Sequence, residues 1–143
     1  MGVHAQRVRG IDYDRRLDGR ILAISVVATE GYYDILVSPE EVIYTGEGGT
    51  YDTASKVTKK RQEFTGGNMA LRNSKDAGNV IRVIRGLKNA EKNGITYIYD
   101  GLYKVTEYWR KLGALNKIYI QFKLRRCPNQ KCIDWNKYKN SFK

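Results

Sequence analysis

Residues 117–126 read KIYIQFKLRR, and apolar side chains alternate with polar ones along the whole segment. A period of two residues is the pattern of a β-strand that buries one face. The segment therefore predicts a strand at the edge of an apolar core. The face turned to that core is expected to carry Ile118, Ile120, Phe122 and Leu124, and the opposite face Lys117, Tyr119, Gln121 and Lys123.

Further strands are predicted on the N-terminal side of this one. Residues 95–99 and 102–109 alternate as well, and Tyr99-Asp100-Gly101 between them is predicted to be a turn. Apolar, β-branched runs predict three more strands, and the polar segments between them are predicted to be loops. These strands are expected at residues 20–29, 41–44 and 80–84, and the loops at residues 30–40 and 50–61.

One short helix is predicted at residues 65–73, TGGNMALRN, with Thr65 as its N-cap and Met69, Ala70 and Leu71 toward the core. About six strands without βαβ alternation favour a twisted, mostly antiparallel sheet that curls into a barrel or half-barrel. The 143 residues are enough for one domain with a core. The sequence therefore predicts a mostly β domain with short flanking helices.

The charge of the chain predicts a polyanionic partner. Lys and Arg number 26 against 15 Asp and Glu, which gives a net charge of +11. An excess of this size in a small domain favours DNA or RNA, with an acidic protein partner or a solubilising surface as the alternatives. The sequence has neither an apolar run of about 18 residues nor a secretory signal. We therefore expect a cytosolic or nuclear protein with no membrane contact.

Motifs of enzymes and metal sites are missing from the sequence. His4 is the only histidine, and Cys127 and Cys132 are too few to make a zinc site without further ligands. Neither a Gly-x-Ser-x-Gly motif nor a phosphate loop is present. In the stretch 46–49, GEGG, Glu47 would repel a phosphate. No catalysis, metal or cofactor is therefore expected.

Several short motifs, in order along the chain, together resemble the SRA domain (SET- and RING-associated, also called YDG), and its plant branch most. The resemblance covers the chain from Gly2 to about Gln130, which predicts an SRA domain at residues 1–130 and a basic tail at residues 131–143. The motifs are GVH at 2–4, GIDY at 10–13, EGY at 30–32, VIYTGEGG at 42–49, GNMALRNS at 67–74, IRVIRG at 81–86, YIYDGLY at 97–103, EYW at 107–109 and FKLRR at 122–126.

The resemblance implies a PUA-like twisted β-barrel that holds 5-methylcytosine flipped out of duplex DNA. It places Tyr32 and Tyr44 as the two stacking rings, Asp34 on the cytosine edge, and Thr45 beside the base through its backbone and methyl group. Such groups replace the stacking and pairing that a flipped base loses. The alternative is that the two tyrosines are ordinary strand-end residues and Asp34 a turn residue.

The resemblance also implies contacts outside the pocket. Val8 aligns with the side chain that fills the vacated base stack, and Arg7 and Arg9 beside it are expected to bind phosphates. Phosphate contacts are also expected from Lys59, Lys60 and Arg61, with a solvated charge run and a basic N-terminus as the alternatives. Asp100 is expected to brace the barrel and not to touch DNA.

Three other functions compete with the methyl-DNA reader. A basic PUA-like module would prefer RNA or single strands, and a nuclease fragment would need its metal motif from a partner chain. A decayed SRA domain would act as an interaction surface, which Glu30 and the short N-terminus favour. No SET-region sequence follows Arg126, so the chain is not expected to be a methyltransferase itself. A nuclear location and a chromatin-modifying protein partner complete the expectation.

Overall fold

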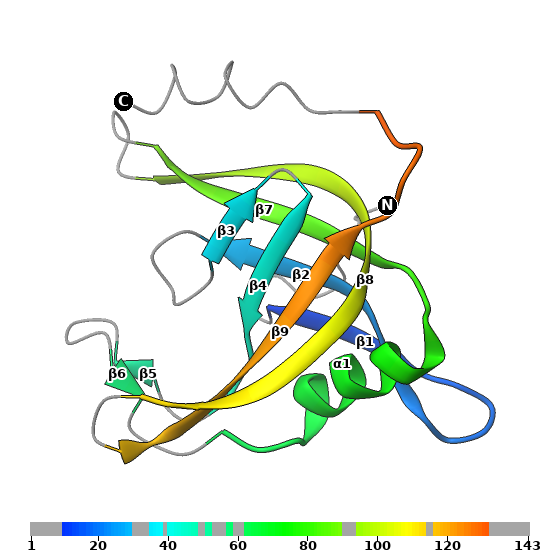
Figure 1. Ribbon diagram of the computed structural model, residues 1–143, viewed down its shortest axis with the longest axis vertical. Coiled ribbons are helices and arrows are strands. Elements are labelled where there is room, and N and C mark those ends of the chain that lie inside the picture. Colours follow the sequence, from blue (N-terminus) through cyan, green and yellow to red (C-terminus); the bar gives the residue numbers. More distant parts are fainter. Residues whose placement is uncertain are drawn as a thin grey trace.

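A curled β-sheet dominates the computed structural model, which describes residues 10–29, 35–38, 40–48, 51–52, 57–58, 62–89, 94–113 and 116–131 (Figure 1). Among these residues, seven strands form one sheet in the order β1-β2-β7-β8-β9-β4-β3. Strands β2 and β7 are parallel, and the other neighbours are antiparallel, as predicted. The strand bounds are β1 Ile11–Arg15, β2 Ile21–Thr29, β3 Ile35–Ser38, β4 Glu41–Thr45, β7 Ile81–Asn89, β8 Gly94–Leu112 and β9 Ile118–Arg126.

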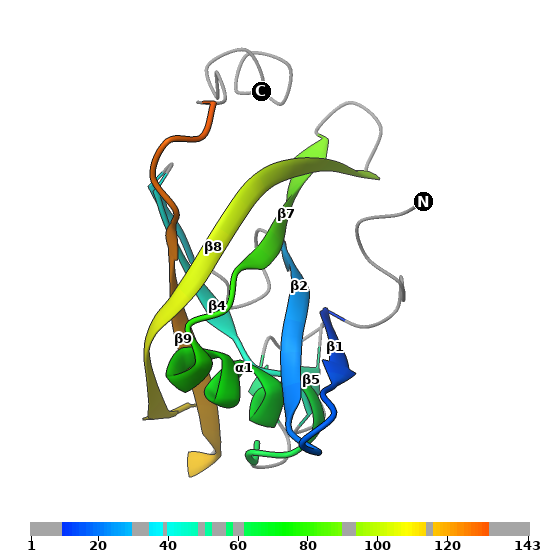
Figure 2. The same cartoon turned by 90° about the vertical axis from the view of Figure 1, so that its right-hand side faces the viewer.

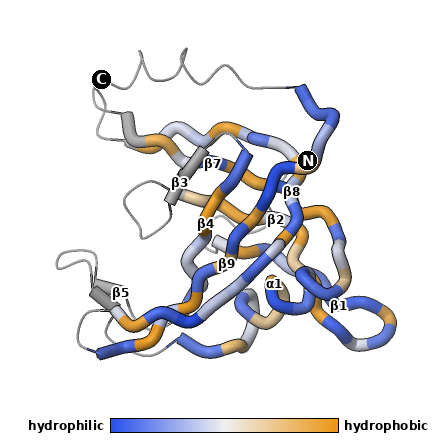
Figure 3. Tube along the Cα trace, viewed as in Figure 1, coloured by the Kyte–Doolittle hydropathy of each residue, from blue (hydrophilic) through white to orange (hydrophobic). Residues whose placement is uncertain are grey.

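The apolar core gathers side chains from six of these strands and one helix. Strand β2 is apolar along most of its length, as Figure 3 shows, because residues on both of its faces are buried. Removing each Ile, Leu, Val or Phe side chain from water contributes about 1.5–3 kcal/mol to folding. The fully buried apolar side chains include Ile11, Val26, Val42, Leu71, Ile81, Val83, Tyr103, Ile120, Phe122 and Leu124.

Helix α1 spans Gly66–Ala77 and lies across one end of the curled sheet (Figure 2). Thr65 is its N-cap residue as predicted, but the Thr65 side chain makes no capping hydrogen bond. The backbone carbonyl of Thr65 instead accepts the N–H of Asn68 at 3.1 Å. The helix ends at Gly78, whose φ of 68° is the left-handed conformation that glycine adopts without strain.

The helix is held to the sheet by apolar packing and by a buried hydroxyl. Ala70 and Leu71 are fully buried as predicted, whereas Met69 is only half-buried. Ser74 lies one turn further along the same face, and its Oγ accepts the backbone N–H of Ala23 at 3.0 Å. This bond ties α1 to β2 at a place where the backbone of β2 has no neighbouring strand partner in β7.

The predicted turn at Tyr99-Asp100-Gly101 is wrong, because β8 runs through it without a break. Ile84 pairs with Tyr99 and Val83 pairs with Gly101, so Asp100 is the extra residue of a β-bulge. Gly101 has a φ of 140°, a conformation that other residues rarely adopt. The glycine therefore serves a bulge that turns the Asp100 side chain inward.

Asp100 is the centre of a buried polar cluster that braces the sheet. Its Oδ2 accepts hydrogen bonds from Arg85 Nε at 2.5 Å and from Tyr103 Oη at 2.5 Å, and its Oδ1 accepts one from Arg126 Nε at 3.2 Å. The cluster joins β7, β8 and the end of β9. Burial, together with the bond to Asp100, raises the pKa of Tyr103 above its usual value of 10.0. The expected bracing role of Asp100 agrees with these contacts, although they are not turn hydrogen bonds.

Short strands occupy two segments that were predicted to be loops. Strand β3 lies within residues 30–40 and pairs with β4, while β5 (Tyr51–Asp52) and β6 (Val57–Thr58) pair with each other within residues 50–61. Strand β1 was not predicted either, and it pairs with β2. Strands β5 and β6 have only two residues each, which is too short to show alternation in sequence.

Strand β9 confirms three of the four residues predicted for its core face, with Ile118 only half-buried, but it does not confirm the predicted solvent face. Ile120, Phe122 and Leu124 are fully buried, yet Tyr119 and Gln121 on the opposite face are buried as well, at 8% and 3% exposure. Gln121 Oε1 accepts the indole N–H of a tryptophan on β8 at 3.0 Å. Alternation reports which residues face the core, but it does not reveal that tertiary contacts cover the second face.

Candidate functional site

The C-terminal end of β4 places Tyr44 and Thr45 on opposite faces of the sheet. Tyr44 pairs in register with Phe122 on β9, and Thr45 pairs with Gln121. Both predicted pocket residues are buried, with 4% exposure for Tyr44 and 2% for Thr45. Tyr44 belongs to the apolar core cluster, so packing against its neighbours holds its ring in place.

The hydroxyl of Tyr44 lies directly over the backbone of Gly10. A Cβ built on Gly10 would overlap Tyr44 Oη and would lie 3.5 Å from Tyr44 Cζ. Gly10 immediately precedes β1, and its carbonyl accepts the N–H of Val27 on β2 at 2.8 Å. The missing side chain at Gly10 therefore determines how far the Tyr44 ring reaches across the sheet.

The backbone of Thr45 points to the edge of β4 away from β9. Gly46 donates its N–H to the carbonyl of Ile120 at 2.7 Å, so these two residues form a hydrogen-bonded pair of the β4–β9 ladder. Hydrogen-bonded and non-hydrogen-bonded pairs alternate in an antiparallel ladder. Thr45, one residue earlier, therefore directs its N–H and C=O toward the edge where β3 pairs with Ile43.

Residues 46–48, here called the pocket turn, follow β4 and are held on one side by Gln62. Gln62 is 5% exposed, and its Nε2 donates to the carbonyls of Gly46 at 2.8 Å and of Gly48 at 3.4 Å. Its Oε1 accepts the N–H of Ile120 at 2.8 Å. One side-chain amide thus joins the pocket turn to β9.

Asn68 and Glu47 join the pocket turn to helix α1. Asn68 Oδ1 accepts the N–H of Glu47 at 2.8 Å, and Asn68 Nδ2 donates to the carbonyl of Glu47 at 2.9 Å. The Glu47 side chain in turn accepts the N–H of Gly67, in the first turn of α1, at 2.9 Å. A carboxylate at a helix N-terminus satisfies a free N–H and is favoured by the helix dipole. Glu47 therefore serves as the partner of a backbone N–H at the start of α1.

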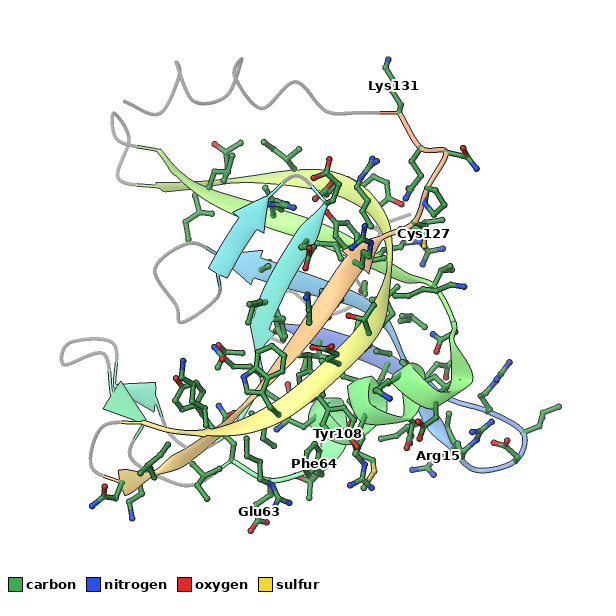
Figure 4. The ribbon with its side chains drawn as sticks, viewed as in Figure 1. Arg15, Glu63, Phe64, Tyr108, Cys127 and Lys131 are labelled. Carbon is green, nitrogen blue, oxygen red and sulfur yellow. The ribbon has the colours of Figure 1, made fainter. Side chains whose placement is uncertain are left out.

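An aromatic and cationic cluster lies beside the helix, where Tyr108 and Arg110 of β8 are partly exposed. Phe64 and Tyr108 lie close together (Figure 4). Their rings meet edge to face with centroids 5.5 Å apart, and the centroids of Tyr108 and Phe122 are 6.0 Å apart. The guanidinium groups of Arg72 and Arg110 lie 4.8 Å and 5.2 Å from the centre of the Phe64 ring. These contacts fix the segment that carries Gln62, because Phe64 is two residues further along the chain.

The other predicted site residues lie outside the described residues. Of the four pocket residues, the structure places Tyr44 and Thr45. The positions that it does not describe are Tyr32, Asp34, Val8, Arg7, Arg9, Lys59, Lys60 and Arg61.

Three residues that hold the site were not found from the sequence. Gln62 has no local signal, because it lies in a polar segment between predicted elements. Asn68 and Gly10 belong to motifs that were recognised, GNMALRNS and GIDY, but their roles depend on contacts with the pocket turn and with Tyr44. Such long-range contacts leave no trace in local periodicity.

Metal sites and membrane spans were searched across the described part of the chain. In that part, no group of three or more His, Cys, Asp or Glu side chains is arranged to hold a metal ion. Helix α1 is too short and too polar to cross a bilayer, and no other helix of the described ranges qualifies.

The family model and the similar proteins all point to one domain family. The model of the SAD/SRA domain family matches residues 1–130. The chain is 39% identical, over its whole length, to the histone-lysine N-methyltransferase, H3 lysine-9 specific SUVH5 of Arabidopsis thaliana, and covers 19% of that protein. A YDG domain-containing protein of the same plant is 40% identical over 91% of the chain, which covers 39% of it. The chain thus spans less than half of either relative.

Solved structures agree with the fold. The SUVH5 SRA domain in complex with fully methylated CG DNA matches with a TM-score of 0.79 and 42% identity, over 92% of this chain and 82% of that one. KRYPTONITE in complex with mCHG DNA and SAH matches with a TM-score of 0.79 and 31% identity, over 92% of this chain and 30% of that one. These similarities confirm the predicted fold class.

Proposed function

Because the chain belongs to the SAD/SRA domain family, we propose that it is a reader of DNA that carries 5-methylcytosine, and not an enzyme. The observation that carries this proposal is the similarity to the SUVH5 SRA domain. That domain was solved in complex with fully methylated CG DNA, and its sequence is 42% identical to this chain. The partner is double-stranded DNA with a methylated cytosine. No cofactor takes part in this reading.

The reading proceeds by base flipping. The methylated cytosine swings out of the duplex and stacks between Tyr32 and Tyr44, while Asp34 accepts the hydrogen bond of the exocyclic amine. Thr45 contributes its backbone beside the base, but its side chain lies on the face of β4 opposite the Tyr44 ring, so the methyl contact that the resemblance implies is not made from the same side. The support from the structure is that Tyr44 and Thr45 are neighbours at one strand end and that Gly10 leaves room for the Tyr44 hydroxyl.

The remaining contacts hold the duplex in place. Val8 enters the gap that the flipped base leaves, and the basic residues bind phosphates on either side. The net charge of +11 supports this arrangement, because phosphate neutralisation supplies much of the affinity of any DNA-binding domain. The phosphate-binding residues are Arg7, Arg9, Lys59, Lys60 and Arg61.

A second candidate is binding of RNA or single-stranded nucleic acid. It is favoured by Tyr97 and Tyr99, which are exposed at alternate positions of β8 and therefore lie on one face of the strand. Exposed aromatic rings on a strand can stack unpaired bases regardless of sequence. Competition between a methylated duplex and a single-stranded RNA of equal length separates the two candidates.

The proposed reader acts in the nucleus. Its proposed protein partner is a chromatin-modifying protein. The support is that the relatives include H3 lysine-9 methyltransferases. Expression of a fluorescent fusion in plant cells tests the location.

The decisive experiment compares two duplexes that differ in a single 5-methyl group, at near-physiological salt. The proposal expects tighter binding of the methylated duplex. It also expects a rise in the fluorescence of 2-aminopurine placed next to the target base, because flipping unstacks that neighbour. Equal affinity for the two duplexes, or tighter binding of single-stranded RNA, would contradict the reader function.

A further inference from the structure

We propose that Asn68 is a positioning residue for recognition of the methylated base, because it fixes the pocket turn that follows Tyr44 and Thr45. This inference rests on the proposed function. It gives a recognition role to a helix residue that does not itself belong to the predicted pocket.

Asn68 binds one residue of the pocket turn from both sides. Its Oδ1 accepts the N–H of Glu47 at 2.8 Å and its Nδ2 donates to the carbonyl of the same residue at 2.9 Å. A neighbouring strand makes the same pair of bonds to one residue of an antiparallel ladder. The side chain of Asn68 therefore continues the pairing of β4 into the turn.

The amide of Asn68 has no hydrogen left to offer to a ligand. Its second Nδ2 hydrogen bonds the carbonyl of Glu63 at 2.8 Å, and the side chain is 2% exposed. A buried amide whose two hydrogens both bond to backbone carbonyls is held in one orientation. Asn68 thus acts through the pocket turn and not by contact with the base.

The fit between the helix and the pocket turn leaves little room for movement. A Cβ on Gly46 would lie 2.5 Å from Asn68 Oδ1, and a Cβ on Gly67 would lie 2.6 Å from Glu47 Oε1. Each glycine thus lets a polar side chain of the opposite segment approach its backbone. The two segments interlock, so a displacement of the turn requires a displacement of the start of α1.

The consequence for recognition follows from the direction of the Thr45 backbone. The N–H and C=O of Thr45 point away from β9, toward the edge of β4 where β3 pairs. The two hydrogen bonds between Asn68 and Glu47, here called the clamp, fix the chain two residues after Thr45. A binding group that is displaced by about 1 Å loses much of its selectivity, so the clamp keeps the Thr45 backbone aligned for the base.

The experiment compares Asn68→Ala with Asn73→Ala. Asn73 lies on the same helix, and its Nδ2 also donates to a backbone carbonyl, that of Ile21 at 3.0 Å, but it does not touch the pocket turn. Both variants remove an amide that holds α1 in place, so both are expected to unfold at lower urea concentration. Each is titrated with methylated and unmethylated duplex, and every affinity is corrected for the folded fraction.

Asn68→Ala is expected to reduce the ratio of methylated to unmethylated affinity at least tenfold and to suppress the 2-aminopurine signal. Asn73→Ala is expected to leave both unchanged. The isosteric Asn68→Asp, which keeps the acceptor but replaces both donors, is expected to behave as Asn68→Ala without opening a cavity. An unchanged ratio in both Asn68 variants, or an equal loss in Asn73→Ala, overturns the proposal.

The wild-type protein distinguishes this failure from that of the proposed function. If the wild type does not prefer the methylated duplex, the reader function itself is wrong. If the wild type shows the preference and the Asn68 variants keep it, only the positioning role is wrong.

Discussion

Gly10 and Tyr44 form a complementary pair in which the backbone of one leaves space for the hydroxyl of the other. A Cβ on Gly10 would overlap Tyr44 Oη, while the next ring atom, Cζ, would lie at an ordinary contact distance of 3.5 Å. The conflict is therefore confined to one oxygen atom. Removal of this oxygen alone therefore tests the position of the Tyr44 ring while the ring itself stays in the protein.

Gly10→Ala is expected to push the Tyr44 ring out of place, to lower the free energy of unfolding by about 1–3 kcal/mol, and to weaken binding of the methylated duplex. In a Tyr44→Phe background the same change is expected to cost much less, because the overlapping oxygen is gone. Urea unfolding and duplex titration of both single variants and the double variant measure this coupling. Additive effects in that cycle would show that the two residues are independent.

Asp34→Ala is expected to abolish the preference for methylated over unmethylated DNA while weak, non-specific binding remains. The carboxylate is proposed to accept the hydrogen bond of the cytosine amine, a contact that exists only when the base is flipped. Titration with the two duplexes measures the preference. An equal loss of affinity for both duplexes would argue against this role of Asp34.

Replacement of Lys59, Lys60 and Arg61 by Ala is expected to weaken binding of methylated and unmethylated duplexes by the same factor. Each lost phosphate contact should lower the slope of log affinity against log salt by about one unit. Titrations at several salt concentrations measure that slope. A slope equal to that of the wild type would mean that these three residues do not contact phosphates.

Asp100→Asn is expected to lower the free energy of unfolding by about 3–5 kcal/mol, because it removes the buried charge that Arg85 and Arg126 share. The matched control is Asp18→Asn, which removes an Asp–Arg pair of similar geometry with both side chains about half exposed. That control should leave the urea midpoint nearly unchanged, since exposed pairs contribute little. Similar midpoints for the two variants would contradict the bracing role of Asp100.

The stability of the protein is expected to fall as the pH rises above 10. Burial and the bond to Asp100 raise the pKa of Tyr103 in the folded state, so the folded protein holds this proton more tightly than the unfolded chain. The stabilisation is complete below the ordinary tyrosine pKa of 10.0 and is lost above it. In Tyr103→Phe this part of the alkaline loss should disappear from urea unfolding curves recorded between about pH 8 and 11. An identical alkaline profile for wild type and variant would exclude the contribution.

The sequence by itself located the segments of β2, β4, β7, β8 and β9, the mostly antiparallel sheet and the resemblance to the family, but it missed β1, β3, β5 and β6. It predicted Ile118, Ile120, Phe122 and Leu124 as core residues, and the structure fully buries the last three and half-buries Ile118. It could not show that residues 99–101 are a bulge within one long strand. The bulge places the Asp100 side chain beside Arg85 and Arg126, which come from other strands, and these contacts form only in the folded protein.

The tertiary structure alone decided how the pocket turn is held. Gln62 binds Gly46 and Asn68 binds Glu47, and these partners lie 16 and 21 positions apart along the chain. The position of the Tyr44 ring depends in the same way on Gly10. Local periodicity records which face of a segment is apolar, but close approach between distant segments exists only once the chain has folded.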